Sequence, residues 1–236
     1  MNTRHASLAE GLGTAALLAI VVGSGIMGER LAQGNTAVAL LANALATGAG
    51  LYVLITLLAP ISGAHFNPVV SVTMWSRGEL SMRDAAGYIA VQVLGAIVGV
   101  VIAHAMFDLP LLQASKHVRS GAGQWCSEIV ATAGLLATIL LALRACSTQI
   151  PALVGSYITA AYWFTASTSF ANPAVTLARS LTETFAGIRP ADVPGFIVAQ
   201  CVGAMIVIVA SRVLTPRRSD ENTVAVEPTS SKSNPA

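Results

Sequence analysis

Long uncharged segments alternate with short charged ones along most of the chain. The segments without Asp, Glu, Lys or Arg are residues 11–28, 31–76, 85–107, 129–143, 145–178 and 193–211. A membrane-crossing helix needs roughly 20 apolar residues, so four of these segments predict one transmembrane helix each, segment 129–143 by including the charge-poor residues before Glu128. Segments 31–76 and 145–178 are too long for one helix and fit two full helices poorly.

An Asn-Pro pair lies in the second half of each long segment, Asn67-Pro68 in the first and Asn172-Pro173 in the second. Asn is a favoured N-cap, and Pro at the first helical position lacks only a donor that would be unsatisfied there anyway. We therefore predict that each pair begins a short re-entrant helix. Because non-helical backbone at membrane depth is tolerated only inside protein or beside a water-filled cavity, both turns should border a pore or binding site.

The sequence also contains an internal repeat. The pattern aromatic-Ile-x-x-Gln-x-x-Gly-Ala occurs as "YIAVQVLGA" from Tyr88 and as "FIVAQCVGA" from Phe196, and "EGLGTAALLAI" from Glu10 matches "EIVATAGLLATI" from Glu128. Each half therefore holds three spans and one half-helix, over roughly 8–107 and 124–214. Three spans per half give the two halves opposite orientations in the membrane.

The predicted fold is an all-α membrane protein with six transmembrane helices plus two re-entrant half-helices in two inverted repeats. These elements form a single transmembrane channel domain over residues 1–218. The polar residues 219–236 are expected to form a disordered cytoplasmic tail.

Composition supports a membrane protein and argues against several other classes. The chain is 54% hydrophobic and 10% charged, with a mean hydropathy of +0.69, which is more apolar surface than one soluble core can bury. Its net charge of +2 is scattered, so we expect a lipid bilayer and no nucleic acid as its partner. We interpret Cys126, Cys146 and Cys201 as small core residues. Since no catalytic triad, phosphate loop or metal-ligand cluster is apparent, we expect neither an enzyme nor a metal or cofactor site.

The distribution of Lys and Arg favours a topology with both termini in the cytoplasm, because cytoplasmic loops carry an excess of these residues. We therefore expect a multi-pass protein of the plasma or inner membrane. In this topology eight basic residues lie inside and five outside, the former being Arg4, Arg77, Arg83, Arg144, Arg212, Arg217, Arg218 and Lys232, and the latter Arg30, Lys116, Arg119, Arg179 and Arg189.

The duplicated motif in "SGAHFNP" and "SFANPA", together with the Glu pair and the Gln-x-x-Gly pair, resembles the major intrinsic protein family of aquaporins and glycerol facilitators over roughly residues 8–214. The resemblance implies a homotetramer whose protomers each contain a pore. It also implies that the two half-helices meet at mid-membrane with Asn67 and Asn172 facing the solute. The implied Asn-Pro motifs comprise Asn67, Pro68, Val69, Asn172, Pro173 and Ala174.

The same resemblance assigns roles to residues before the motifs. The backbone carbonyls of Gly63, Ala64 and His65 would form the acceptor side of the pore. Glu10 and Glu128 correspond to buried glutamates that hold the re-entrant loops through hydrogen bonds. A buried carboxylate in a span is generally functional or paired, and this pairing is a structural role.

The outer constriction departs from the family pattern. Most members have arginine directly after the second Asn-Pro-Ala, where this chain has Val175. The family spacing places Thr47 where a bulky aromatic residue is common, and the backbone near Ser169 supplies a further part of the wall. A small, largely apolar set would then replace a tight charged filter, and the outer pore should be wider.

Two positions near the outer pore stay open. The fifth-span filter position falls near Ala160, to within about one turn, and Tyr162 or Trp163 could take its place. Arg179 lies one helical turn beyond the Val175 position and could act as a displaced filter charge. Alternatively, it holds the C-terminus of the half-helix or pairs with Glu183.

Four hypotheses for function follow. The first is a passive channel for small uncharged solutes such as polyols, urea or metalloid hydroxides like arsenite, together with water, that excludes ions and protons. The second is a water-selective aquaporin narrowed by Arg179 and a fifth-span aromatic residue. The others are a proton-coupled carrier that uses Glu10 and Glu128, and a structural membrane protein with a closed pore. Neither of the last two explains why two helix N-termini would be brought to the membrane centre.

Overall fold

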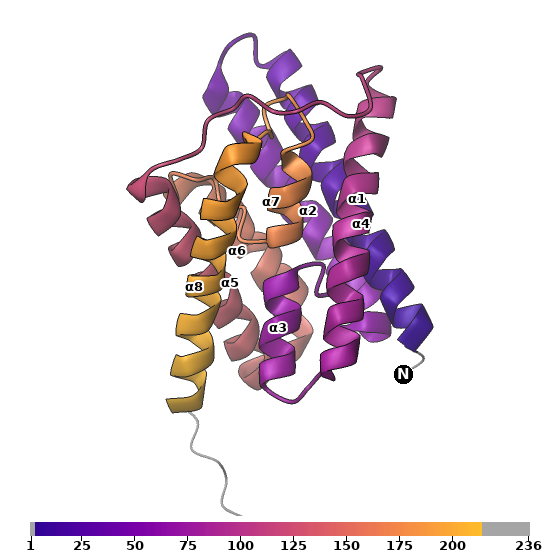
Figure 1. Cartoon of the computed structure of the whole chain (residues 1–236), viewed down its shortest axis with the longest axis vertical. Helices are drawn as coiled ribbons and strands as arrows, with labels where there is room; N and C mark the ends of the chain where they lie inside the picture. The colour runs from indigo at the N-terminus through magenta and orange to yellow at the C-terminus, as the bar shows by residue number, and fades with distance from the viewer. Residues whose placement is uncertain (1–2, 214–236) are drawn as a thin grey trace, which may run out of the picture.

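The computed structural model describes residues 3–213, and every regular element in that part of the chain is helical (Figure 1). This confirms the all-α fold. The bounds are α1 Thr3–Leu31, α2 Thr36–Ser62, α3 Pro68–Ser76, α4 Met82–Met106, α5 Ala122–Ala145, α6 Ile150–Phe164, α7 Pro173–Arg179 and α8 Val193–Val213, with the short 3-10 helices η1 Ser147–Gln149 and η2 Pro190–Asp192.

Five helical segments within the described residues are long and apolar enough to cross a membrane: α1, α2, α4, α5 and Pro190–Val213. The remaining predicted span corresponds to α6, which has 15 residues and continues directly from η1. Large apolar side chains face outward on these helices, as expected of surfaces that contact lipid tails; examples are Leu57 on α2, Leu94 on α4 and Met205 on α8.

The two halves use equivalent helix pairs. Helix α1 packs on α4 in the first half, as α5 packs on α8 in the second, and α2 joins the halves by packing on α6. Small residues allow the close contacts. A Cβ atom added at Gly95 would lie 2.2 Å from the carbonyl oxygen of Gly11, and one at Gly203 would lie 2.6 Å from that of Ile129.

The short helices α3 and α7 lie in opposite halves of the bundle, with their N-termini toward its middle (Figure 1). Each begins at the proline of an Asn-Pro pair, as predicted. Asn67 caps α3 by accepting a hydrogen bond from the Val69 N–H, and Asn172 caps α7 by accepting from the N–H groups of Ala174 and Val175.

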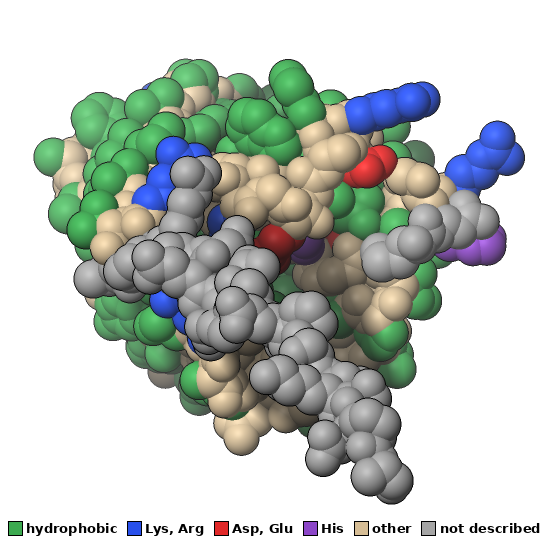
Figure 2. Space-filling view, turned by 90° about the horizontal axis from the view of Figure 1, so that it is seen from below, with side chains coloured by type: hydrophobic (Ala, Val, Ile, Leu, Met, Phe, Trp, Pro, Cys, Tyr) green, Lys and Arg blue, Asp and Glu red, His purple; other side chains and the backbone are tan. Residues whose placement is uncertain are grey.

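We call the two ends of the bundle proximal and distal. The proximal end is where α1 begins and α8 ends, and Figure 2 views it, with hydrophobic side chains around the sides and charged ones on the end itself. At the opposite, distal end, residues 107–121 cross the bundle between α4 and α5, and we call them the distal strap. The strap is hydrogen-bonded along residues 180–189, for example from the Ser115 N–H to the Ser180 carbonyl at 3.0 Å.

The structure bears on the expectation for the three cysteines and does not reach the expected tail. The interpretation of the cysteines as core residues is wrong, because the free thiols of Cys126 and Cys201 are exposed and that of Cys146 is half-buried. In a membrane protein the outer surface is as apolar as the core, so apolar neighbours do not indicate burial. The predicted tail at 219–236 lies outside the described residues.

Candidate functional site

A cavity of about 360 Å³ runs between the two halves of the bundle. Both Asn-Pro turns contribute to its wall, as do α1, α2, α5 and α6. The predicted site residues that line it are Thr47, Gly63, Ala64, His65, Asn67, Ser169, Asn172, Val175 and Arg179. The remaining members of the predicted Asn-Pro motifs, Pro68, Val69, Pro173 and Ala174, are absent from the lining, and Val70 and Met74 reach it from α3.

The side chains of the two asparagines connect the half-helices reciprocally. Asn67 Nδ2 donates to the Ala171 carbonyl at 2.8 Å, and Asn172 Nδ2 donates to the Phe66 carbonyl at 2.8 Å. Each Asn thus uses its oxygen to cap its own helix and one N–H to hold the turn that precedes the other helix. Since a carboxamide has two N–H donors, each Asn retains one more donor where its side chain meets the cavity.

The turns before the asparagines have an unusual backbone. Ala64 and Phe66 have φ of 51° and 48°, and Ser169 and Ala171 match them with 51° and 48°. Non-glycine residues rarely adopt this left-handed region, so two similar strained turns in the two repeats indicate a functional constraint. In each turn two successive N–H groups are directed to the same side, where those of His65 and Phe66 donate to Glu10 and those of Phe170 and Ala171 donate to Glu128.

Glu10 on α1 holds the first turn. Its Oε1 accepts from the Ser62 hydroxyl at 2.7 Å and the His65 N–H at 2.8 Å, and its Oε2 accepts from the Phe66 N–H at 2.7 Å and from Gln92 Nε2 at 2.8 Å. The carboxylate is fully buried, and this set of four donors compensates for its removal from water.

Glu128 on α5 does the same for the second turn. Its Oε1 accepts from the Phe170 N–H at 2.9 Å, and its Oε2 accepts from the Ala171 N–H at 2.9 Å and from Gln200 Nε2 at 2.6 Å. Gln200 also donates to the Thr176 hydroxyl at 2.8 Å, as Gln92 donates to that of Ser71 at 3.0 Å in the first half. The Glu and Gln pairs of the sequence repeat therefore form one equivalent network in each half.

The rest of the cavity wall is largely apolar. Side chains from four helices form this wall, namely Leu17, Val21, Leu51, Ile55, Leu135, Ile139, Val154 and Ile158. A molecule in the cavity therefore meets hydrogen-bonding groups from the turns and hydrocarbon elsewhere. Such a lining suits a small molecule that carries both polar and apolar faces.

This geometry can be compared with known proteins. The profile of the family described as "Major intrinsic protein" matches residues 1–168. The chain belongs to this family. It is 57% identical over 212 residues to a protein named Aquaglyceroporin AqpS from Rhizobium meliloti (strain 1021), covering 89% of this chain and 91% of that one.

More distant relatives match as well. Aquaporin-2 of Rattus norvegicus is 38% identical over 100 residues, covering 42% of this chain and 35% of the relative. The X-ray structure of the aquaglyceroporin from Plasmodium falciparum has the same fold, with a TM-score of 0.71 at 22% identity over 90% of this chain and 97% of that one. As a member of this family, the chain is a membrane channel and not an enzyme.

The distal half of the cavity is formed by side chains from α2, α6 and α7. Val175, which directly follows the second Asn-Pro-Ala, is buried in the wall. Thr47 and Tyr162 meet across the cavity with their hydroxyl oxygens 3.3 Å apart. Ala160 is exposed and does not line the cavity, so the expected fifth-span position must be corrected to Tyr162. Trp163, the other alternative, is 48% exposed.

Arg179 lies at the distal end of α7 and lines the cavity although it is only 2% exposed. Its Nε donates to the Ala186 carbonyl, and its Cζ lies 3.5 Å from the centroid of the Phe170 ring. Its Nη1 is buried without a hydrogen-bond partner among the described residues. The alternative of pairing with Glu183 is wrong, because that carboxylate accepts from the Lys116 N–H and forms no ion pair with Arg179.

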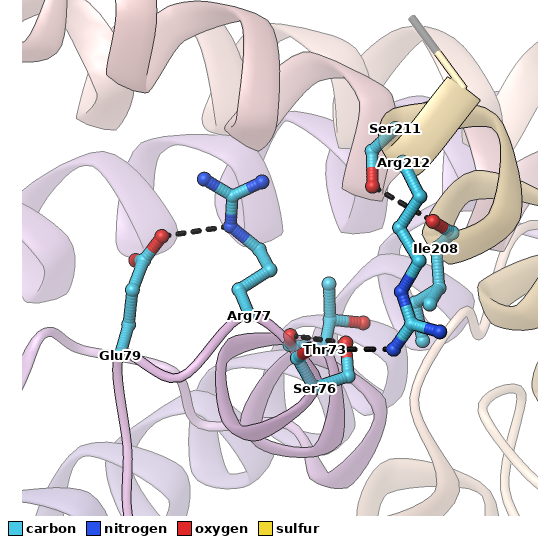
Figure 3. Close-up of polar contacts among 7 residues, drawn as sticks. All are labelled: Thr73, Ser76, Arg77, Glu79, Ile208, Ser211 and Arg212. Carbon is cyan, nitrogen blue, oxygen red and sulfur yellow. Dashed lines mark hydrogen bonds and ion pairs between the residues drawn. The ribbon is translucent and has the colours of Figure 1, made fainter. Parts of the chain in front are cut away.

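Sequence reasoning missed the charged residues at the proximal mouth. Glu79, in the loop after α3, lines the cavity there and pairs with Arg77 at 2.7 Å (Figure 3). Arg212 at the end of α8 donates to the Ser76 carbonyl at 3.4 Å and so connects the two halves at this end. These residues lie outside both Asn-Pro motifs, and for Arg77 and Glu79 only their position in a short charged loop of the sequence could have indicated them.

Proposed function

We propose that this channel passively conducts small uncharged solutes, together with water, and excludes ions and protons. The observation that carries the proposal is the reciprocal pair of hydrogen bonds by which Asn67 and Asn172 hold the two turns together at one cavity. Each asparagine has a second N–H available to a solute oxygen. The carbonyl groups of the turns can accept from the same solute, so a neutral hydroxyl compound exchanges its hydration for protein hydrogen bonds.

Ions lack this compensation. An ion that loses its water in a low-dielectric passage pays a far larger penalty than a neutral solute, unless charged or metal-coordinating groups replace the water. The asparagines offer N–H donors, which do not coordinate cations, and the carbonyl groups of two turns do not surround an ion as a hydration shell does. Two half-helix N-termini, each with a partial positive charge, add a further barrier to cations and protonated water.

We infer that the solutes include molecules larger than water. Val175 and Thr47 leave apolar and small groups where a bulkier or charged filter would restrict the pore, and a relative with 57% identity is named an aquaglyceroporin. Arg179, Tyr162 and the backbone near Ser169 complete this distal constriction. Candidate solutes are polyols such as glycerol, urea, and metalloid hydroxides such as arsenite.

The test is the flux of these solutes into proteoliposomes of the purified full chain. Swelling in glycerol and urea gradients, and uptake of arsenite, should exceed those of empty vesicles, while a proton gradient should persist. Val175→Arg should lower glycerol flux more than water flux, because a guanidinium there narrows the passage. Fast water flux with glycerol, urea and arsenite all excluded would reject the proposed solute class.

The second candidate is a water-selective channel. It is favoured by the unpartnered Nη1 of Arg179 and by the close approach of Tyr162 to Thr47, which together could narrow the distal cavity. In that case Arg179→Ala should admit glycerol to a channel that otherwise excludes it. A wild-type channel that already conducts glycerol would contradict this alternative.

We also propose that the protein is a homotetramer of the cell membrane with both termini in the cytoplasm. The described residues carry five Lys or Arg toward each end, and the excess that supports the orientation comes from Arg217, Arg218 and Lys232, which follow α8 in the sequence. Exposed apolar side chains on the helices can contact lipid and other protomers. Protease protection of a C-terminal tag in sealed vesicles tests the orientation. Sedimentation in detergent tests the tetramer, and a monomeric mass would refute it.

A further inference from the structure

Arg119 of the distal strap points its guanidinium toward the connections on either side of α7. Its Nε donates to the Gly187 carbonyl at 2.8 Å, and its two terminal nitrogens donate to the Ser167 and Phe185 carbonyls at 3.4 Å each. These carbonyls belong to the segments that enter and leave α7. One side chain from a distant part of the sequence therefore ties together both connections of the second half-helix.

Arg119 also contacts the cavity wall from behind. Its Cζ lies 5.2 Å from the centroid of the Phe170 ring, whereas the Cζ of Arg179 lies 3.5 Å from the same centroid. Phe170 lines the cavity, and its ring packs edge-on against Phe196 with centroids 5.1 Å apart. Two arginines and one aromatic ring thus determine where the Phe170 side chain lies.

The contacts of Arg119 depend on shape more than on charge. Among the described residues, no carboxylate forms an ion pair with its guanidinium, and burial lowers its pKa from the ordinary value for arginine. Asp192 accepts instead from the Arg119 backbone N–H at 2.9 Å. A planar fork that donates to three carbonyls and faces an aromatic ring cannot be reproduced by the point charge of lysine.

We infer that Arg119 is a positioning residue for the distal constriction. It acts through Phe170 and the two connections of α7, and so sets the largest solute that the channel admits. The inference rests on the proposed function and deepens it. Without the guanidinium, Phe170 loses one of its contacts and the backbone of α7's connections loses three hydrogen bonds, so that the wall beside Arg179 can move outward.

The experiment compares Arg119→Gln and Arg119→Lys with a matched control, Arg30→Gln. Arg30 also lies at the distal end, over the Phe107 ring at 5.1 Å, and donates to the Phe107 carbonyl at 3.2 Å, but Phe107 does not line the cavity. Each variant is reconstituted, and its permeabilities to water, urea, glycerol and a five-carbon polyol are measured. For each variant, the permeability to each solute is divided by the permeability to water, and this permeability ratio is compared with that of the wild type.

Both Arg119 variants should raise the ratio for the largest solutes by about 2- to 5-fold, the factor that corresponds to one cation–π contact, while the control leaves it unchanged. A purely structural role would reduce the number of active channels and lower all permeabilities together, so the ratio would not move. An unchanged ratio in Arg119→Gln, or wild-type behaviour of Arg119→Lys, would overturn the inference.

A second comparison shows whether Phe170 transmits the effect. Phe170→Leu removes the ring, and adding Arg119→Gln to it should change the ratio by less than the same change does in the wild type. Full additivity would contradict action through Phe170. If the wild type conducts only water, the proposed function fails, but the inference about Arg119 can still be tested. Arg119 variants that admit urea or glycerol would then support it, and variants that still exclude both would overturn it.

Discussion

The substitution Glu10→Gln provides a quantitative test of how the first re-entrant turn is held. The carboxylate accepts four hydrogen bonds at 2.7 to 2.8 Å. Glutamine has nearly the same shape, but its amide nitrogen cannot accept, so two of the four donors would face another donor. Reorienting the Gln92 amide can satisfy one of them, because Gln92 Oε1 has no partner among the described residues.

At least one buried donor then stays unpaired, which costs about 1–3 kcal/mol, and two unpaired donors cost about twice that. In one orientation of the introduced amide the unpaired group is the Phe66 N–H; in the other it is the His65 N–H, because the Ser62 hydroxyl can turn to accept. Phe66 also supplies the carbonyl to which Asn172 donates, so a shift of this turn disturbs the centre of the pore as well. We therefore expect both lower stability and lower flux.

The assay combines thermal unfolding in detergent with water and glycerol flux in proteoliposomes. For a chain of this size, 1 kcal/mol corresponds to roughly 2–4 °C in unfolding temperature, so Glu10→Gln should unfold at least that much lower. Glu29→Gln is the control, since Glu29 is exposed and accepts one bond, from the Phe185 N–H at 3.2 Å. An unfolding temperature and a flux equal to those of the wild type would refute the reasoning.

Two further predictions concern helix contact and the pore centre. Gly95→Val should destabilise the fold by about 1–3 kcal/mol or abolish reconstitution, because its Cβ would lie 2.2 Å from the Gly11 carbonyl oxygen. A Cβ at Gly87, on the same helix, meets nothing within 4 Å, so Gly87→Val is the control, and the unfolding temperatures of the two variants are compared. Asn67→Ala should lower stability by about 1 kcal/mol, because α3 loses its cap, and should lower the flux of every solute. Wild-type flux of this variant in stopped-flow light scattering would contradict the prediction.

The sequence was sufficient to predict the features that follow from a local rule. Asn-Pro pairs begin helices for stereochemical reasons, so the starts of α3 and α7 could be read from two residues each. Likewise, a carboxylate inside an apolar span must find hydrogen-bond donors, and the resemblance to the major intrinsic proteins implied that Glu10 and Glu128 find them in the re-entrant loops. Repetition of both signals in each half then gave the fold class.

The register of α6 could not be predicted in the same way. Residues 150–164 are largely apolar, because one side of this helix meets the cavity and the other faces outward. Hydrophobic periodicity therefore carries little information about which residues point inward. Ala160 and Tyr162 differ by about half a turn, and tertiary packing alone decides that Tyr162 meets Thr47.

Arg179 illustrates a different limit, because its surroundings come from distant parts of the chain. Spacing on α7 suggested a partner in Glu183, four residues away, yet that carboxylate binds the strap and the guanidinium stacks on Phe170. Which partner is chosen depends on how the distal strap crosses the bundle, and no local pattern determines that path. Arg119, from the strap, and Arg179, from α7, contact the same Phe170 ring, so the position of this part of the wall depends on contacts between segments that are far apart in the sequence.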